Sequence, residues 1–288
     1  MTAWRIALLA ALLSGCTTAR IGPPPPALAL APFYTRSIDA GGIPVSSSNA
    51  VPNKALKVAR SIIDDMLARR PDLRRALVGS GQRVAIMGRD EGTLDLPEQS
   101  DWKKPMIDDP RLTVCERKHY DERIGRRSDR EYWNARARGM GGLLTSAATE
   151  NLLGEPGTRY YGENIFVHEF SHAILGAVRT ADPTLYRQVE AAYADAMRRG
   201  LWKGEYGATT VDEYWAEGTQ FWFESNKVVV IDGRQILSAA DLAAYDPALA
   251  DVLRGVNGER HRLKADIFWR HPARVPPGGP PTNTAEVC

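Results

Sequence analysis

Residues 165–178 read IFVHEFSHAILGAV, and this stretch constrains the fold of the whole chain. Its apolar residues lie nearly all the way round a helix, which is typical of a helix that is buried on every side. Gly162 precedes the stretch and Pro183 follows it, so the pattern predicts a helix of ordinary length. Any polar residue on such a helix needs a partner, because desolvating a polar group is costly.

The polar residues of this predicted helix form the motif His168-Glu169-Phe170-Ser171-His172, which holds two of the five histidines of the chain. Two histidines four residues apart lie one above the other on the same helix face. Both imidazoles can then bind a single Zn²⁺, while the glutamate between them reaches a water molecule beside the metal. The alternative is that both histidines are hydrogen-bonded core residues and that the glutamate faces a crevice.

A catalytic zinc ion keeps three protein ligands and one open position, so a third ligand must lie elsewhere in the chain. A longer form of the motif has a third histidine six residues after the second, but Val178 stands there and the next histidine is His261. A carboxylate further along the chain is therefore the better candidate. Glu190 fits by distance, yet no acidic residue follows it one helical turn later.

Glu213 and Glu217 form a stronger candidate pair, because they lie four residues apart on one face of a predicted helix. One carboxylate can bind the metal while the other, one turn later, orients a metal-binding imidazole. We assign Glu213 to the metal and Glu217 to the imidazole, and the reverse assignment stays open. A capping box formed by Thr210 and Glu213, with Glu217 at an exposed helix position, is the other explanation.

Residues 206–217, YGATTVDEYWAE, taken together with HEFSH, resemble the catalytic domain of anthrax lethal factor and its metallopeptidase relatives over about residues 163–224. The roles that this resemblance implies are zinc binding for His168, His172 and Glu213, general base for Glu169, and assistance to catalysis for Tyr206. It also implies an α+β fold, with a mainly helical zincin-type metallopeptidase domain, a small β-sheet and the motif on a buried active-site helix. The segment between His172 and Tyr206 differs in length from that of the toxin.

Apolar periodicity predicts the remaining elements of the domain. Helices are expected at residues 53–69, 183–199 and 211–225, and strands at residues 43–46 and 83–87. Residues 139–146 begin with a glycine and form either an edge strand or a loop; an exposed edge can hold an extended peptide. The charged residues from about 116 to 138 mix both signs, which indicates a solvated loop or helix face.

The N-terminus has the pattern of an export signal. Arg5 precedes an apolar run at residues 6–13, which is too short to span a bilayer. The sequence LSGC at residues 13–16 resembles the lipobox of bacterial lipoproteins, which implies cleavage before Cys16 and acylation, for example with palmitate. The alternative is an ordinary signal peptide that is cleaved a few residues later. A lipid anchor would hold an exported protein at a membrane surface, facing the periplasm or the cell exterior.

The sequence divides into a signal peptide (1–15), a lipidated cysteine with a Pro-rich tether (16–32), a metallopeptidase domain (33–271) and a Pro/Gly-rich tail (272–288). Cys115 and Cys288 lack the paired spacing of zinc sites. In an oxidising compartment they either form a disulfide that holds the tail or stay as free thiols. The 37 basic and 35 acidic residues give a net charge of +2, which gives no indication of a nucleic-acid partner.

These observations predict a zinc-dependent metalloendopeptidase that binds one Zn²⁺ and hydrolyses a peptide or protein substrate. Zinc activates a water molecule, Glu169 takes its proton, and zinc and the Tyr206 hydroxyl stabilise the oxyanion. The alternatives are a zinc amidase acting on a non-protein amide such as cell-wall peptide, and a catalytically inert, anchored binding lipoprotein. Glu169 argues against the last, because a structural zinc site needs no general base. The sequence defines no specificity pocket.

Overall fold

A mixed β-sheet forms one side of the molecule. The computed structural model describes residues 20–280 apart from residues 111, 113 and 232. Within them, a five-stranded sheet has the order β1-β2-β3-β5-β4. Its strands are β1 (Arg36–Asp39), β2 (Pro44–Ser47), β3 (Arg83–Met87), β4 (Gly139–Met140) and β5 (Leu144–Ala148). β2, β3 and β5 are parallel, whereas β1 and β4 run antiparallel at the two edges.

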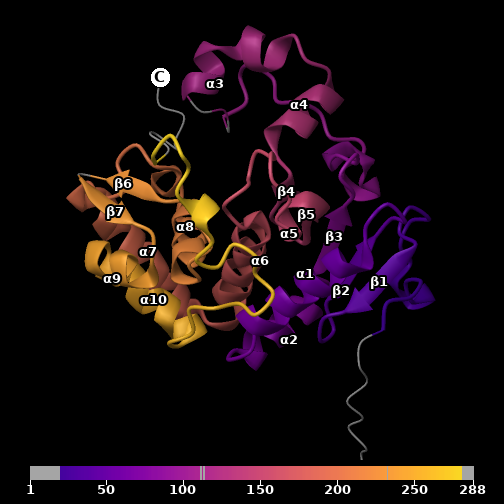
Figure 1. Cartoon of the computed structure of the whole chain (residues 1–288), viewed down its shortest axis with the longest axis horizontal. Helices are drawn as coiled ribbons and strands as arrows, with labels where there is room; N and C mark the ends of the chain where they lie inside the picture. The colour runs from indigo at the N-terminus through magenta and orange to yellow at the C-terminus, as the bar shows by residue number, and fades with distance from the viewer. Residues whose placement is uncertain (1–19, 111, 113, 232, 281–288) are drawn as a thin grey trace, which may run out of the picture.

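Helices make up most of the rest, so the fold is α+β with a small sheet, as the sequence predicted. The helices are α1 (Asn53–Met66), α2 (Pro71–Gly79), α3 (Val114–Lys118), α4 (Asp129–Arg136), α5 (Thr149–Leu152), α6 (Ile165–Ala181), α7 (Pro183–Arg199), α8 (Val211–Trp222), α9 (Ala239–Tyr245) and α10 (Pro247–Asn257). β6 (Val229–Ile231) and β7 (Arg234–Ile236) form a separate hairpin. In Figure 1, α6 lies between the sheet on one side and α7 to α10 on the other.

α6 is the buried helix that the sequence predicted. Asn164 caps its N-terminus, because the Asn164 side chain accepts a hydrogen bond from the backbone N–H of Val167 at 3.3 Å. Large apolar side chains on several faces of the helix, including those of Phe166, Phe170 and Val178, are fully buried. The helix packs against α2, α7, α8 and β5. Its apolar circumference thus explains its place between the sheet and the C-terminal helices.

α8 lies against α6 and ends earlier than predicted. Its N-terminus is capped by Thr210, whose hydroxyl accepts a hydrogen bond from the backbone N–H of Glu213 at 3.1 Å. The indole N–H of Trp215 donates to the backbone carbonyl of Ser171 at 3.0 Å, which ties α8 to α6. The predicted helix ran to residue 225, but α8 stops at Trp222, and Glu224 adopts a left-handed φ of 54°.

Residues 139–146, predicted as an edge strand or a loop, form two strands joined by a turn. β4 is the edge strand, and it pairs antiparallel with β5. β5 is not an edge, since it lies between β3 and β4. Gly142 in the turn has a φ of 123°, which residues with a side chain rarely adopt. The glycines therefore allow a hairpin where the sequence suggested a single element.

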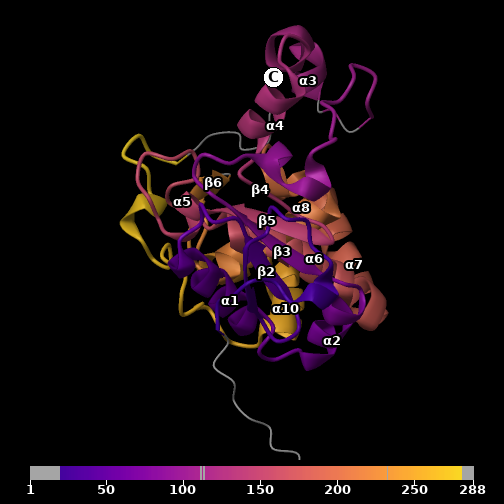
Figure 2. The ribbon, with the colours of Figure 1, turned by 90° about the vertical axis from the view of Figure 1, so that its right-hand side faces the viewer.

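Residues 101–138, which we call the arch, project away from the sheet. The arch carries α3 and α4 and lies at the top of both Figure 1 and Figure 2. It has a small apolar cluster of its own, formed by Leu112, Ile124 and Tyr132. Met106 and Val114 are 65% and 79% exposed. Most charged side chains of this segment are exposed, as predicted, but Glu116 is buried, and the segment is a projecting unit that the sequence did not reveal.

The ends of the described chain join the folded domain. Gly22, in the predicted tether, exchanges two backbone hydrogen bonds with Ser37 of β1. Arg274, in the predicted tail, is almost fully buried. The predicted tether and the predicted tail therefore both pack on the domain, whose bounds the sequence analysis had placed at residues 33 and 271.

The predicted signal peptide, the lipidation of Cys16 and the pairing of Cys115 with Cys288 involve residues 1–19 and 281–288, which lie outside the described residues. All three stay predictions. Cys115 itself is buried in the arch. Among the residues that the structure describes, no helix is long and apolar enough to cross a membrane.

Candidate metal centre

Three side chains from α6 and α8 form a group that could hold a metal ion. His168, His172 and Glu213 each offer one ligand atom, and these atoms lie within 4.8 Å of one another. Glu213 Oε2 lies 2.9 Å from His168 Nε2 and 3.5 Å from His172 Nε2. The four-residue spacing places both imidazoles on one face of α6. The packing of α8 against α6 then brings the carboxylate to them.

Gln220 of α8 sets the orientation of His168. Its side chain is fully buried, and its Nε2 donates to the backbone carbonyl of Asn164 at 3.0 Å. The amide oxygen therefore faces His168 Nδ1, also at 3.0 Å. An amide oxygen can only accept, so Nδ1 carries a proton and Nε2 is directed toward Glu213. This is the arrangement that a metal-binding imidazole needs.

Glu217 stands behind His168 rather than among the ligand atoms. Its Oε1 lies 3.5 Å from His168 Nδ1, and its Oε2 accepts a hydrogen bond from Asn226 Nδ2 at 2.7 Å. Burial raises the pKa of Glu217 to about 7, although the charge of His168 opposes the shift. The carboxylate is thus held by Asn226 where it can stabilise positive charge on the imidazole.

The charges around the group fit a divalent cation. Burial lowers the pKa of His168, but the hydrogen bond to Glu213 and the charges of Glu169 and Glu217 outweigh it and raise that pKa to about 10. Burial raises the pKa of Glu213, but its hydrogen bonds to His168 and His172 hold it well below its usual range. Three carboxylates therefore attract positive charge to this point. Two imidazoles and one carboxylate are a known ligand set for catalytic Zn²⁺.

Glu169 lies between the ligand atoms and the edge strand. Burial raises the pKa of its carboxyl, the charges of His168 and His172 oppose the shift, and the backbone N–H of Gly141 donates a hydrogen bond to it. A Cβ added at Gly139 would lie 3.1 Å from Glu169 Cγ, and one added at Gly141 would lie 3.0 Å from His172 Cβ. β4 and the turn after it thus approach α6 closely because both positions are glycine.

Tyr206 reaches the same group from the short 3₁₀ helix Tyr206–Ala208. Its hydroxyl donates to Glu213 Oε1 at 3.1 Å. Burial and then the Glu213 carboxylate raise the pKa of the phenol well above its usual range, and the charge of Arg136 opposes the shift. The hydroxyl therefore stays protonated at neutral pH and can donate a hydrogen bond.

The carboxylate and histidine that the sequence argument set aside lie elsewhere. Glu190 is exposed on α7. The ring of His261 packs on Trp222, and His261 Nδ1 lies 3.1 Å from the Trp222 backbone carbonyl. Neither residue belongs to the metal group among the residues that the structure describes.

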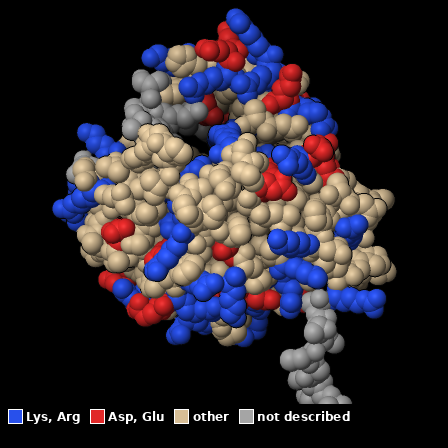
Figure 3. Space-filling view, in the orientation of Figure 1, with Lys and Arg blue, Asp and Glu red and all other residues tan. Residues whose placement is uncertain are grey.

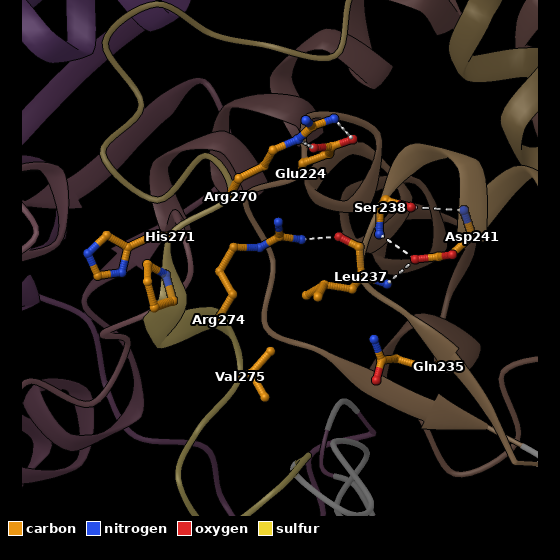
Figure 4. Close-up of a pocket in the computed structure, with 10 residues that line it drawn as sticks. Glu224, Gln235, Leu237, Ser238, Asp241, Arg270, His271, Arg274 and Val275 are labelled. Atoms are coloured by element: carbon orange, nitrogen blue, oxygen red, sulfur yellow. Dashed lines mark hydrogen bonds and ion pairs between the residues drawn. The ribbon is translucent and has the colours of Figure 1, made fainter.

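A cavity of about 350 Å³ lies apart from the metal group and is shown in Figure 4. Arg274 and the ion pair of Arg270 with Glu224 line it, and none of its described lining residues is a metal ligand. Arg274 Nε donates to the backbone carbonyl of Asn226 at 2.6 Å. Because Asn226 in turn holds Glu217, Arg274 supports the metal group from behind.

Sequence reasoning missed Gln220, Asn226 and the glycines as parts of the site. Gln220 could have been found, because it follows Glu213 by seven residues and so lies on the same face of α8. The glycines were noted only for a strand or loop. Asn226 carried no signal, since it lies beyond the end of α8 and approaches Glu217 only through the fold.

Comparisons with known proteins add little to this description. No protein-family model and no curated protein matches the chain. One solved structure that aligns with it is that of the PRO-PRO endopeptidase PPEP-2 from Paenibacillus alvei. The two are 13% identical, the alignment covers 69% of this chain and 90% of that chain, and the TM-score is 0.42. Such a similarity assigns neither a family nor an activity, so the metal centre rests on its own residues.

Proposed function

We propose that this protein is a zinc-dependent metalloendopeptidase. The observation that carries the proposal is the grouping of His168, His172 and Glu213 within 4.8 Å, with Glu169 on the same helix beside them. A structural zinc site has four protein ligands, whereas three ligands leave a position open for chemistry. The tautomer that Gln220 imposes on His168 supports the same conclusion.

Bound zinc would polarise the substrate carbonyl and make a water molecule more acidic. Glu169 takes the proton of that water as it attacks the carbonyl carbon, and then gives the proton to the leaving amine. Its raised pKa suits both halves of this task, because a base must also act as an acid later. The Tyr206 hydroxyl, which stays protonated, donates a hydrogen bond to the oxyanion that develops on the substrate.

The edge strand favours a peptide as the substrate. One side of β4 pairs with β5, and in the described structure no strand pairs with its other side. β4 runs directly beside Glu169, as the contact at Gly139 shows. An extended peptide that added to this edge would lie across the metal group. Zinc would also serve an amidase that acts on the cell wall, but a non-protein amide would not need to pair with the free edge of β4.

We also propose that the protein is exported and anchored at a membrane through Cys16. This rests on Arg5, the apolar run at residues 6–13 and the sequence LSGC at residues 13–16. In the mature protein the tether would then hold the metal centre near a membrane surface.

The test of the enzymatic proposal is a zinc assay paired with cleavage of a mixed peptide library. We expect one zinc ion per chain in the parent protein and in Glu169→Gln, since Glu169 is not a ligand. The variant should lose roughly 10²–10⁴-fold in kcat/KM, because the general base is gone. Glu190→Gln, which changes an exposed glutamate of α7, is the matched control and should behave as the parent does.

Activity that a chelator does not remove, or a Glu169→Gln variant as active as the parent, would contradict the proposed mechanism. Cleavage of cell-wall fragments with no cleavage of any library peptide would favour the amidase. Full zinc occupancy with neither activity would favour an inert binding protein.

A further inference from the structure

Arg136 is a charged residue near the metal centre that the mechanism above does not use. It is the last residue of α4, and its side chain is 43% exposed. Its Nε lies 3.8 Å from Glu116 Oε1 of α3, which is longer than a hydrogen bond. It also hydrogen-bonds Tyr132 of its own helix. Part of the side chain thus remains open to solvent on the arch.

The path of the chain keeps Arg136 close to the reacting groups. Gly139 follows it by three residues, and three residues span at most about 11 Å. Gly139 lies beside Glu169, since an added Cβ would lie 3.1 Å from Glu169 Cγ. A peptide lying along β4 would advance about 3.3 Å per residue. Arg136 is therefore within reach of substrate residues up to about three positions from the bond that is cleaved.

The electrostatic influence of Arg136 agrees with this placement. Burial raises the pKa of Tyr160, the charges of Arg159 and Arg136 oppose this shift, and those of Glu163 and Glu169 add to it. Tyr160 therefore senses both Arg136 and a carboxylate beside the metal group.

The surface leaves room for a substrate at this point. Figure 3 shows the molecule hollowed between the arch and the remainder of the protein, with Lys or Arg and Asp or Glu side chains at the rim. In Figures 1 and 2, α3 and α4 stand beyond the end of the molecule that carries β4. A peptide on β4 would therefore pass beneath the arch, near the end of α4 that carries Arg136.

We infer that Arg136 binds a carboxylate of the substrate, so that the enzyme prefers peptides with an acidic group within about three residues of the cleaved bond. A guanidinium binds a carboxylate through two parallel hydrogen bonds, which the long contact with Glu116 does not provide. The inference rests on the proposed function. The carboxylate belongs either to an aspartate or glutamate side chain or to the C-terminus of the peptide.

Arg136 also has an electrostatic reason to matter. The carboxyl groups of Glu169, Glu213 and Glu217 lie at the metal group, and negative charge on them repels an acidic peptide. Arg136 offsets that repulsion on the side of the arch. Arg136→Glu should therefore not only remove the preference for acidic peptides but replace it with a preference for basic ones.

The experiment compares cleavage of matched peptides by the full chain and by variants at α4. The peptides carry Asp, Asn or Lys at each position up to three residues from the cleaved bond, with free or amidated C-termini. We expect the parent to favour Asp at one position, or a free C-terminus, by at least tenfold in kcat/KM. Arg136→Gln should remove this preference and Arg136→Glu should reverse it in favour of Lys, while Arg136→Lys retains part of it.

Arg130→Glu is the matched control, because Arg130 is a half-exposed arginine of the same helix in an ion pair with Asp95. It should leave the preference unchanged. Binding of the acidic peptide to Glu169→Gln, measured by fluorescence anisotropy, should weaken when Arg136→Gln is added. Cleavage without any acidic preference, or an unchanged preference in both Arg136→Gln and Arg136→Glu, overturns this inference alone. A parent protein that cleaves no peptide overturns the proposed function and the inference with it.

Discussion

The helix pair α6–α8 and the arch place charged residues in opposite environments. In the helix pair, His168 and Gln220 are buried, and a chain of hydrogen bonds fixes their orientation. In the arch, the side chains of Arg136 and Arg130 are half-exposed to solvent, and each forms an ion pair with an acidic residue, Glu116 and Asp95 respectively. Buried polar groups are costly to leave unpaired, whereas surface pairs contribute little to stability. Rigid metal binding and adaptable substrate contact are thus assigned to different parts of the molecule.

The largest expected effect comes from removing a ligand from the helix pair. Glu213→Ala should abolish stoichiometric zinc binding and with it all measurable peptidase activity, because only two ligands remain. Glu217→Ala is the comparison, since its carboxylate lies behind His168, and it should retain zinc with reduced affinity. Metal analysis of both purified variants decides between them. Zinc retained by Glu213→Ala and lost from Glu217→Ala would exchange the two roles.

A smaller effect is expected from the amide that orients His168. Gln220→Leu replaces the amide with an apolar side chain of similar size, which removes the acceptor for His168 Nδ1 and the hydrogen bond to the Asn164 carbonyl. Zinc affinity should fall roughly 10- to 100-fold, as is typical when such a supporting hydrogen bond is lost. Competition with a chromogenic chelator measures the change. Gln99→Leu alters another buried glutamine and should leave zinc affinity unaltered; equal losses in both variants would point to general destabilisation instead.

The smallest effect is expected at Asp266, where a substitution should change the stability of the fold but not the metal group. Its carboxylate accepts a hydrogen bond from Asn164, the N-cap of α6, and burial raises its pKa to about 6 from 3.8. Because the pKa of Asp266 is higher in the folded protein than in the unfolded chain, its contribution to the free energy of unfolding is fully present below about pH 4. This contribution is lost as the pH rises through about 6. Asp266→Asn should remove this pH-dependent loss of stability. A pKa shift of about one to two units corresponds to about 1–3 kcal/mol.

Denaturant unfolding of zinc-free protein at pH 4 and pH 7 tests this prediction. The variant should gain stability relative to the parent between the two pH values. A difference between the two proteins that is the same at both pH values would show that Asp266 ionises in the folded state as easily as in the unfolded chain.

The sequence predicted those elements whose pattern is local. β3 at Arg83–Met87 and α7 at Pro183–Arg199 have the predicted bounds, because a short apolar run and a proline at N1 mark them directly. The predicted helix at residues 53–69 ends sooner, at Met66, since Pro71 starts α2 only a few residues later. The sequence did not predict the hairpin of β4 and β5, because glycine is compatible with both a turn and a strand.

By itself the sequence determined the spacing of His168, Glu169 and His172, the second helix that carries Glu213 and Glu217, and the buried character of α6, since each follows from helical periodicity. The tertiary structure decided which nitrogen of His168 faces Glu213, which glutamate stands behind it, and that Arg136 lies near Tyr206. These depend on contacts between residues far apart in the chain. No local pattern encodes such contacts, because they arise only when helices, strand and arch pack together.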